Sequence, residues 1–491
     1  MNLAAFFLLP LATGCLLLLW QPAARLSRRI SLLVSGALVG GAFRIAAKCG
    51  DGEVLSHTFG SWPPPFGIVF VVDRLGALFI TLHALLLFVT LVALRPETHG
   101  ENTVRRAHPL LMVATFGLFG AFMTGDLFNL FVMFEVVLVS SYLLIQVPGT
   151  ERSLVSAMPM IVINTSASAL FVAGLGLLYG IGGSLNIADL IQRIGGTPHG
   201  LRLAGLGMLV AAFATKAALV PLCFWMPATY PTLTAPAAAL FAGIMTKLGV
   251  YSLLRISPLL AHEPVLLTVL LWLGGFSAIL GVLAALSQYE LRRLLSFHSV
   301  SQVGYVVLAL GLHTVFGIAA AIFFALHHSL VKSTLYLVAD ELERSNSSRD
   351  LRQMDFRRPG NVVLATAFGI AAFALAGSPP LSGFFGKLAI FWASFESGEW
   401  TGLALLVVAS IFTLASMLKI WGFAFQRRPV EEESVSTTPA STFRPTAVLM
   451  MSALIVVFSL AAGPIFRYGF EAAEQVLDVS DSSVVLLRGD R

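Results

Sequence analysis

The feature that most constrains this chain is a succession of long apolar segments separated by short polar ones. A helix needs about 20 apolar residues to cross the hydrocarbon core of a bilayer, where its backbone groups must be satisfied internally. The 491 residues are 57% hydrophobic and 12% charged, whereas soluble proteins carry about 25% charged residues. We therefore expect an all-α polytopic membrane protein of about fourteen transmembrane helices. The expected spans are residues 2–21, 30–47, 68–93, 108–124, 127–146, 158–182, 203–225, 234–256, 264–287, 295–312, 315–339, 361–395, 402–424 and 445–466.

The distribution of basic residues predicts the orientation. The first apolar run lacks a basic segment before it and is followed by Arg25, Arg28 and Arg29, so we expect a retained first span rather than a cleaved signal. An even number of spans places both termini on one side. Most Lys and Arg residues fall in the alternate loops that contain Arg25, Arg105, Arg293, Arg352 and Arg427. The positive-inside rule predicts that these loops are cytoplasmic and that both termini lie outside.

Composition excludes several classes of function. The formal charge of +5 comes largely from loop arginines facing lipid headgroups, so no nucleic-acid partner is implied. Cys15, Cys49 and Cys223 have no paired spacing, which predicts neither a disulfide framework nor a metal site. We expect no cofactor.

Three polar stretches interrupt the apolar pattern. Residues 340–359 are rich in Glu and Arg and predict a surface helix or an ordered loop on the cytoplasmic face. Residues 428–445 read as a flexible linker, and residues 49–66 are long enough for a small hairpin on the outer side.

The lysines are distributed unlike the arginines. Arginine stays protonated in proteins, whereas burial can neutralise a lysine, so lysines in the bilayer suit a switchable proton carrier. A charge at the bilayer centre costs at least about 2.5 kcal/mol. The alternative is that each lysine is a structural partner for a carboxylate or a helix-end carbonyl. Only Lys48 lies at a span end, and the others lie within apolar segments: Lys216, Lys247, Lys332, Lys387 and Lys419.

Glu135 is the most isolated acid of the chain, because it lies near the middle of an expected span. Its most economical partner is a buried lysine, and such a pair can hold its proton in two ways. Asp126 begins the same span and is better explained as a helix cap or an access group.

Two expected spans are broken by proline. Pro221 follows Lys216 by five residues, and Pro379 and Pro380 precede Lys387. Backbone broken at membrane depth is tolerated only beside protein or water, and paired discontinuous helices are typical of transporters. A hinge without transport is the alternative.

Two more lysines lie on polar helix faces. Lys247 shares a face with Tyr251, and His328 shares one with Lys332. A histidine that titrates near neutral pH can pass protons between lysines. Core packing and metal binding are the alternatives for the two adjacent histidines, although no third ligand has suitable spacing. Lys419 lies nearer a helix end and can either join the relay or extend its ammonium outward.

Several motifs resemble the antiporter-like subunits shared by respiratory complex I, membrane-bound hydrogenases and Mrp-type sodium/proton antiporters, and within that family most closely the D-type Mrp subunits. The resemblance covers most of the chain. The motifs lie at residues 134–135, 214–227, 291–296, 297–305 and 377–387.

The resemblance implies two inverted five-helix repeats at residues 108–256 and 264–424, after an N-terminal segment 1–107 and before a C-terminal part 425–491. It implies that Glu135 pairs with Lys216, that Lys247, His328 and Lys332 continue a horizontal polar axis, and that Lys387 ends it. Other membrane subunits, the lipid of a bacterial cell membrane, H⁺ and Na⁺ are the implied partners, and the position of any cation site is left open.

Three functions are compatible with the sequence. The first is a proton-translocating subunit of a multisubunit Na⁺/H⁺ antiporter, which is a transporter and not an enzyme. The second is a proton-pumping subunit of a complex I-like or hydrogenase electron-transfer complex. The third is a membrane scaffold without transport, which the buried lysines disfavour.

Overall fold

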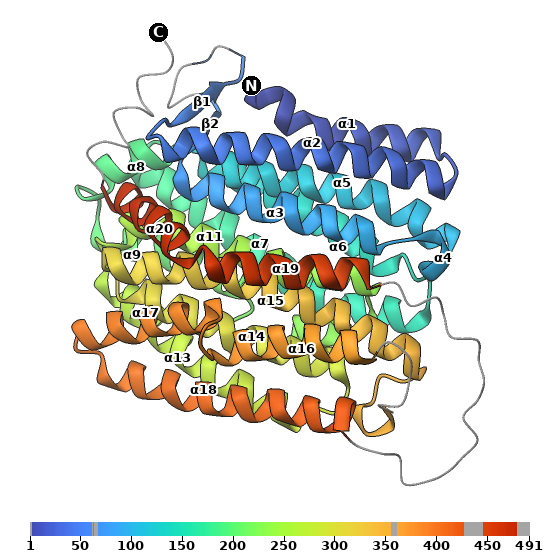
Figure 1. The fold of residues 1–491 in the computed structure, drawn as a ribbon. Coiled ribbons are helices and arrows are strands. Elements are labelled where there is room, and N and C mark those ends of the chain that lie inside the picture. Colours follow the sequence, from blue (N-terminus) through green and yellow to red (C-terminus); the bar gives the residue numbers. More distant parts are fainter. Residues whose placement is uncertain (1, 61, 63–66, 355–360, 427–444, 479–491) are drawn as a thin grey trace, which may run out of the picture.

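The computed structural model describes residues 2–60, 62, 67–354, 361–426 and 445–478, and within these ranges the chain is almost entirely helical. Most of the helices run roughly parallel or antiparallel along one direction (Figure 1). The first half consists of α1 (Leu3–Trp20), α2 (Ala24–Gly50), β1 (Leu55–Thr58), β2 (Val69–Val72), α3 (Arg74–Ala93), α4 (Pro96–His99), α5 (Glu101–Met123), α6 (Leu127–Gln146), α7 (Glu151–Gly182), α8 (Ile187–Ile194), α9 (His199–Lys216), α10 (Trp225–Thr229), η1 (Tyr230–Thr232) and α11 (Ala235–Arg255).

The second half continues the same bundle. It consists of α12 (Ser257–Leu260), α13 (Pro264–Ser287), α14 (Leu291–Gly311), α15 (Val315–Asn346), η2 (Leu351–Gln353), α16 (Asn361–Ala376), α17 (Ser382–Glu396), α18 (Trp400–Trp421), η3 (Gly422–Gln426), α19 (Thr446–Leu460) and α20 (Ala462–Leu477).

The predicted fold class is confirmed, but the count of fourteen spans is not. Among the described residues, 11 helices are long and apolar enough to cross a membrane, or 12 if the bent pair α19 and α20 counts as one span. The two remaining expected spans are the proline-broken ones. There the chain forms the shorter pairs α9 with α10 and α16 with α17, because the helix stops several residues before each proline.

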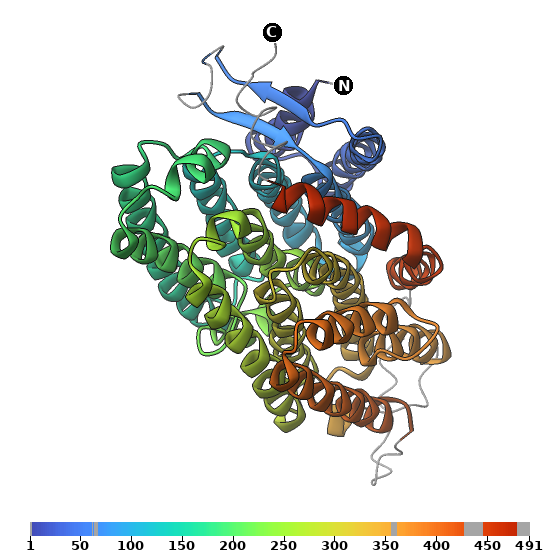
Figure 2. The ribbon, with the colours of Figure 1, turned by 90° about the vertical axis from the view of Figure 1, so that its left-hand side faces the viewer.

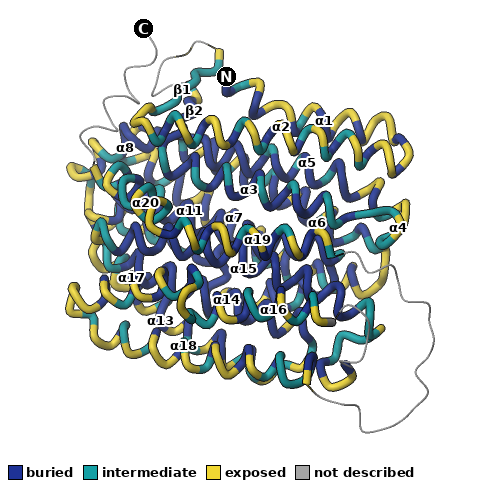
Figure 3. The backbone as a smooth tube through the Cα atoms, viewed as in Figure 1, coloured by how far each residue is buried: buried dark blue, intermediate teal, exposed yellow. Residues whose placement is uncertain are grey.

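Three helices form the centre of the bundle. Figure 2 shows the bundle nearly end on, with the first helices and the hairpin at one edge and α16 to α18 at the other. Every residue in the most apolar stretch of α11 and of α14 is buried, and α15 is buried along most of its length. Figure 3 shows this dark central band between the more exposed outer helices. Polar groups on α11, α14 and α15 are therefore shielded from lipid on all sides.

The α13 and α14 helices approach each other closely through glycine. A Cβ atom added at Gly281 would lie 2.5 Å from the backbone nitrogen of Ser301. A Cβ atom at Gly304 would lie equally close, 2.5 Å from the backbone nitrogen of Ala278. The pair resembles the small-residue interfaces by which membrane helices pack, since lipid offers no hydrophobic force to hold them together.

The structure has a hairpin near the predicted place, but only its first strand lies within residues 49–66. β1 and β2 pair antiparallel with Leu55 opposite Val72. The second strand begins at Val69, three residues beyond the expected loop, so the third span begins at Arg74 and not at residue 68. The predicted linker at residues 428–445 falls almost wholly outside the described residues.

The polar stretch after residue 339 differs from the expected surface segment. α15 continues to Asn346, and its acids Asp340, Glu341 and Glu343 are buried, at 7%, 9% and 7% exposure. They are buried because arginines, including Arg292 of α14, form ion pairs with them. Charges of opposite sign from another helix were not visible in the local sequence.

A buried ion pair fastens the start of α3 to the end of α11. Both guanidinium NH groups of Arg255 contact the carboxylate of Asp73, at 2.5 and 2.9 Å. Asp73 also caps α3 by accepting from the Gly76 backbone N–H at 2.8 Å. The neighbouring Arg255 charge and hydrogen bonds outweigh burial and hold the pKa of Asp73 below its usual value.

We predict that Arg255→Ala lowers the free energy of unfolding by about 3 kcal/mol, because it leaves a buried carboxylate unpaired. Thermal unfolding of the purified protein in detergent measures the loss. Arg467→Ala is the matched control, because the Arg467 side chain is 84% exposed in its pair with Glu471, and it should change stability little. Equal effects of the two substitutions would contradict the assignment.

Candidate functional site

The first helix break follows Lys216 directly. α9 ends at Lys216, Ala218 takes a left-handed conformation with φ of 59°, and Pro221 lies in the non-helical link before α10. The freed Thr215 carbonyl accepts a hydrogen bond from the indole of Trp225 at 3.0 Å. The Val220 N–H donates to the side-chain oxygen of Ser277 at 3.0 Å. The break is therefore satisfied by neighbouring protein, as membrane depth requires.

Ser168 of α7 stands between Glu135 and Lys216. Its hydroxyl donates to the Glu135 carboxylate at 2.5 Å and accepts from the Lys216 ammonium at 3.0 Å. Lys216 also donates to the Asn164 carbonyl at 3.5 Å and lies 5.3 Å from the ring centre of Phe134. Glu135 and Lys216 are both described, and no direct ion pair joins them. The expected direct pair is thus a pair bridged by one hydroxyl.

The second helix break holds Lys387. Its Nζ atom donates to the carbonyl of Ala376, the last residue of α16, at 3.0 Å and lies 5.1 Å from the ring centre of Tyr305. Pro379 and Pro380 lie between α16 and α17. Both lysines predicted at breaks are therefore found there, each buried, with 4% exposure for Lys216 and 3% for Lys387.

Lys247, His328 and Lys332 lie together in the central band. Lys247 donates to the Ala242 carbonyl at 2.9 Å and Lys332 to the Leu295 carbonyl at 3.0 Å. Among the described residues no carboxylate forms an ion pair with either lysine. The two ring nitrogens of His328, one helical turn from Lys332 on α15, have no hydrogen-bond partner in the described chain. A ring with both nitrogens free can accept a proton on one side and release it on the other.

Two buried histidines that the sequence analysis did not select form hydrogen bonds with α17 and α18. His298 of α14 contacts the hydroxyl of Ser416 at 2.7 Å, and His327 of α15 contacts the hydroxyl of Ser382, at the start of α17, at 2.8 Å. Both rings are fully buried. In the local sequence, the polar residues around His298 in an otherwise apolar helix were the signal that pointed to this histidine.

Lys419 lies apart from these groups. Its ammonium donates to the carbonyls of Leu286 and Gln288, both at 2.7 Å, at the end of α13. It also lies 3.8 Å from the ring centre of Tyr289. A cation on the last carbonyls of a helix stabilises that helix end.

Asp126 is the cap that its position predicts. It accepts from the Asn129 N–H at 2.8 Å and begins α6. Burial raises the pKa of its carboxyl, against the hydrogen bonds it accepts. No group of three or more His, Cys, Asp or Glu side chains within the described ranges has the arrangement of a metal site.

The arrangement consists of proton-binding groups held in a protein interior, where Lys216 reaches the Glu135 carboxylate through Ser168 and Lys247, Lys332 and Lys387 donate to backbone carbonyls. Neutral and charged forms of each lysine can be satisfied by the same carbonyl or hydroxyl, because an amine and an ammonium both donate. Such a series of amines, imidazoles and hydroxyls can bind and pass protons.

Fold and site together define a polytopic membrane protein with proton-binding groups along its centre. Comparisons with known proteins identify its family. Residues 124–413 match the family model described as NADH:quinone oxidoreductase/Mrp antiporter, TM. The D-type subunit of the Na⁺/H⁺ antiporter of Alkalihalophilus pseudofirmus is 37% identical over 476 residues, which cover 96% of each chain. The subunit of the same name in Bacillus subtilis is 31% identical over 484 residues, again covering 96% of each.

A solved structure shows the same fold. A chain of the Mrp complex from Dietzia sp. DQ12-45-1b superposes with a TM-score of 0.90 at 29% identity, covering 99% of this chain and 100% of that one. The chain belongs to the NADH:quinone oxidoreductase/Mrp antiporter family.

We predict that Ser168 carries the energetic coupling between Glu135 and Lys216. A double-mutant cycle with Glu135→Gln and Lys216→Met, read by thermal unfolding, should give a coupling of about 1–3 kcal/mol. In a Ser168→Ala background the coupling should fall by roughly half or more, because the bridge is gone. Ser166→Ala is the control, since that hydroxyl bonds only its own helix at Val162. A coupling unchanged in Ser168→Ala would refute the bridge.

Proposed function

We propose that this chain is the proton-translocating subunit of a multisubunit cation/proton antiporter, with sodium as the coupled cation. The observation that carries the proposal is the pair of broken helices, each ending or beginning beside a buried lysine, with a lysine and histidine group between them. The relatives named as Na⁺/H⁺ antiporter subunits support antiport over electron-transfer pumping. The superposed Mrp complex supports partner subunits in the same membrane.

The proton path begins at the bridged pair. A proton on Lys216 is attracted by the Glu135 carboxylate through the Ser168 hydroxyl. When Lys216 releases its proton, the Ser168 hydroxyl keeps its bond to Glu135 and the neutral amine is held by the Asn164 carbonyl. The pair therefore has two states that differ in charge at the first helix break, which is what a coupled carrier requires.

The path continues through the central band to the second break. Lys247, His328 and Lys332 form the middle of the axis, His298 and His327 link it to α17 and α18, and Lys387 ends it. Like charges in a buried group repel, so occupancy of one site lowers the affinity of the next for a proton. Protons can then move as a series of exchanges rather than fill every site.

We propose that Lys419, which the sequence left as a possible relay member, lies outside this path. Its two carbonyl acceptors end α13, and its side chain is half-buried. We assign it to the stability of the α13 end.

The orientation follows from the basic loops. We propose a bacterial cell membrane location with the arginine-rich end of the bundle in the cytoplasm and both termini outside. The arginine-rich end is the end that carries Arg25, Arg105, Arg293 and Arg352. α4 and the end of α15 lie at this end, opposite the hairpin (Figure 1).

We predict that Lys216→Ala lowers sodium-driven proton release roughly 100-fold or more, because it removes a proton-transfer group. The measurement uses everted membrane vesicles that hold the assembled complex, an imposed pH gradient and a fluorescent pH probe, with sodium added last. Lys419→Ala is the control and should keep most of the rate. Unchanged sodium-driven proton release in Lys216→Ala would contradict the relay. An equal loss of proton release in both variants would show that removal of any lysine disturbs assembly.

A further inference from the structure

A proton axis from Glu135 to Lys387 needs access to a membrane surface, and within the described part of the chain a file of polar residues leads from Lys332 toward one end of the bundle. Along α15, the residues Lys332, Tyr336 and Asp340 follow one another at intervals of four, so they share one helix face. Lys332 and Tyr336 are fully buried, and Asp340 is 7% exposed. The file runs from the central band to the arginine-rich end.

The opposite wall of the file comes from α14. Arg292 and Ser296 are four residues apart on this helix, and both are buried, at 4% and 0% exposure. The Ser296 and Tyr336 hydroxyls contact each other at 2.8 Å. These two α14 residues belong to the motif at 291–296 that the antiporter axis left without a role.

The Ser296 and Tyr336 hydroxyls face the same carbonyl, so their hydrogen bonds can be arranged in two different orders. Ser296 is placed to donate to the Arg292 carbonyl at 2.8 Å, Tyr336 to the same carbonyl at 3.2 Å, and the hydroxyls to each other. Two hydroxyl hydrogens cannot fill three hydrogen bonds at once. Either Tyr336 donates to Ser296 while Ser296 donates to the carbonyl, or the order is reversed. Passing from one order to the other is how a hydroxyl pair relays a proton.

The inner end of the file meets Lys332. The Lys332 ammonium is held by the carbonyl of Leu295, the residue before Ser296. Its four-carbon stem has freely rotating bonds, so a rotamer change can turn the amine toward the hydroxyl pair one helical turn away.

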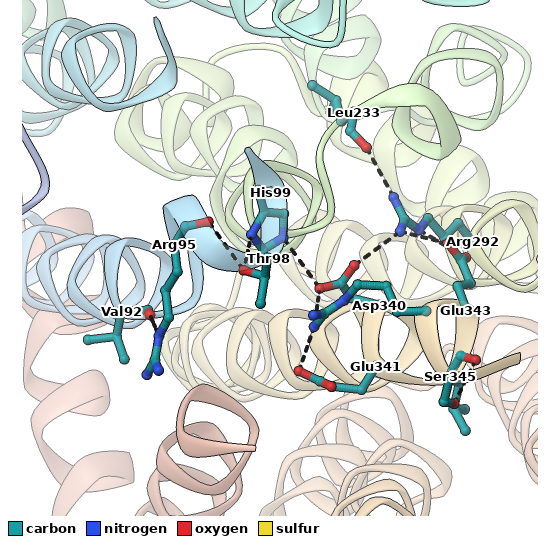
Figure 4. Close-up of polar contacts among 12 residues, drawn as sticks. Val92, Arg95, Thr98, His99, Leu233, Arg292, Asp340, Glu341, Glu343 and Ser345 are labelled. Atoms are coloured by element: carbon teal, nitrogen blue, oxygen red, sulfur yellow. Dashed lines mark hydrogen bonds and ion pairs between the residues drawn. The ribbon is translucent and has the colours of Figure 1, made fainter. Parts of the chain in front are cut away.

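The outer end of the file is an ion-pair cluster beside an open hollow. It consists of Arg292, Asp340, Glu341 and Glu343, which Figure 4 shows, together with Arg344. Arg292 contacts Glu343 at 2.7 Å and Asp340 at 3.6 Å, and Arg344 contacts Asp340 at 3.0 Å and Glu341 at 2.6 Å. An open hollow of about 640 Å³ borders Arg292, Glu343 and Arg344. A cavity of about 20 Å³ borders Asp340, Glu341 and Arg344, enough for one water molecule.

Arg292 connects the ion-pair cluster to the file of hydroxyls. The Arg292 carbonyl is the acceptor that faces the Ser296 and Tyr336 hydroxyls, and the Arg292 guanidinium pairs with Glu343. His99 of α4 faces Asp340 at 3.6 Å, and Arg349 faces Glu343 at 3.6 Å. Arg292 also donates to the Leu233 carbonyl at 3.0 Å, in the segment between η1 and α11.

We propose that Tyr336 and Ser296 form the route by which protons pass between the arginine-rich end of the bundle and Lys332. This route rests on the proposed function and would give the buried proton axis access to one membrane surface. A proton that enters from water at the cluster binds one hydroxyl oxygen, that hydroxyl passes its own proton to the next, and the last proton converts the neutral Lys332 amine to the ammonium. Each hydroxyl keeps one proton but now donates in the opposite order, and it turns back before the next transfer, so no charge stays on the file.

The test measures sodium-driven proton movement by the assembled complex in everted vesicles, with rates normalised to the amount of complex. Tyr336→Phe keeps the buried ring and removes only the hydroxyl, and Ser296→Ala shortens the other partner. We expect each to lower the rate about tenfold, within the range of single proton-transfer groups, and to raise the ratio of rates in H₂O and D₂O. Ser296→Thr, which restores a hydroxyl, should recover most of the rate.

The matched control is Thr334→Val on the same helix. The Thr334 hydroxyl is fully buried and bonds the Leu330 carbonyl at 2.8 Å, one turn back along α15. It should leave both the rate and the isotope ratio unchanged. If Tyr336→Phe and Ser296→Ala behave like Thr334→Val while Lys216→Ala is inactive, the hydroxyls are structural and the route is overturned. If the wild-type complex itself moves no protons with sodium, the proposed function fails instead.

Discussion

The structure depends on the cost of placing an ammonium group in the hydrocarbon region, which is several kcal/mol for each group without a partner. In this chain the buried lysines donate hydrogen bonds to uncharged oxygen atoms. Four buried lysines donate to backbone carbonyls, and Lys216 adds the Ser168 hydroxyl. A carbonyl holds an amine as well as an ammonium, whereas a carboxylate strongly favours the charged form. The choice of acceptor therefore leaves these lysines able to gain and lose protons.

The same constraint explains the architecture around them. α11, α14 and α15 are covered by other helices, so the polar groups they carry never face lipid. The two helix breaks place free backbone groups at the edges of this covered region, where Trp225, Ser277 and Lys387 satisfy some of them. Close glycine packing between α13 and α14 holds the wall on which Ser296 and His298 lie.

The sequence predicted the parts of this arrangement that depend on local pattern. The length of the apolar runs predicted the helical spans, and the prolines predicted the two helix breaks. Glu135 and the lysines were identified because they are isolated polar residues in apolar runs. It did not predict Ser168, because a serine in an apolar helix most often bonds its own backbone one turn away. The burial of Asp340 and Glu343 was missed for a related reason: their partner Arg292 is 51 residues from Glu343. Groups that act through contacts between distant helices leave no signal in spacing.

The central claim is that the buried lysines work by releasing their protons and not by carrying a fixed charge. Lys216→Arg tests it most directly, because arginine keeps the positive charge and the hydrogen-bond donors but stays protonated in proteins. The account predicts that the assembled complex with Lys216→Arg binds its partner subunits normally and shows almost no sodium-driven proton movement in everted vesicles. Proton movement at the wild-type rate in that variant would contradict the account.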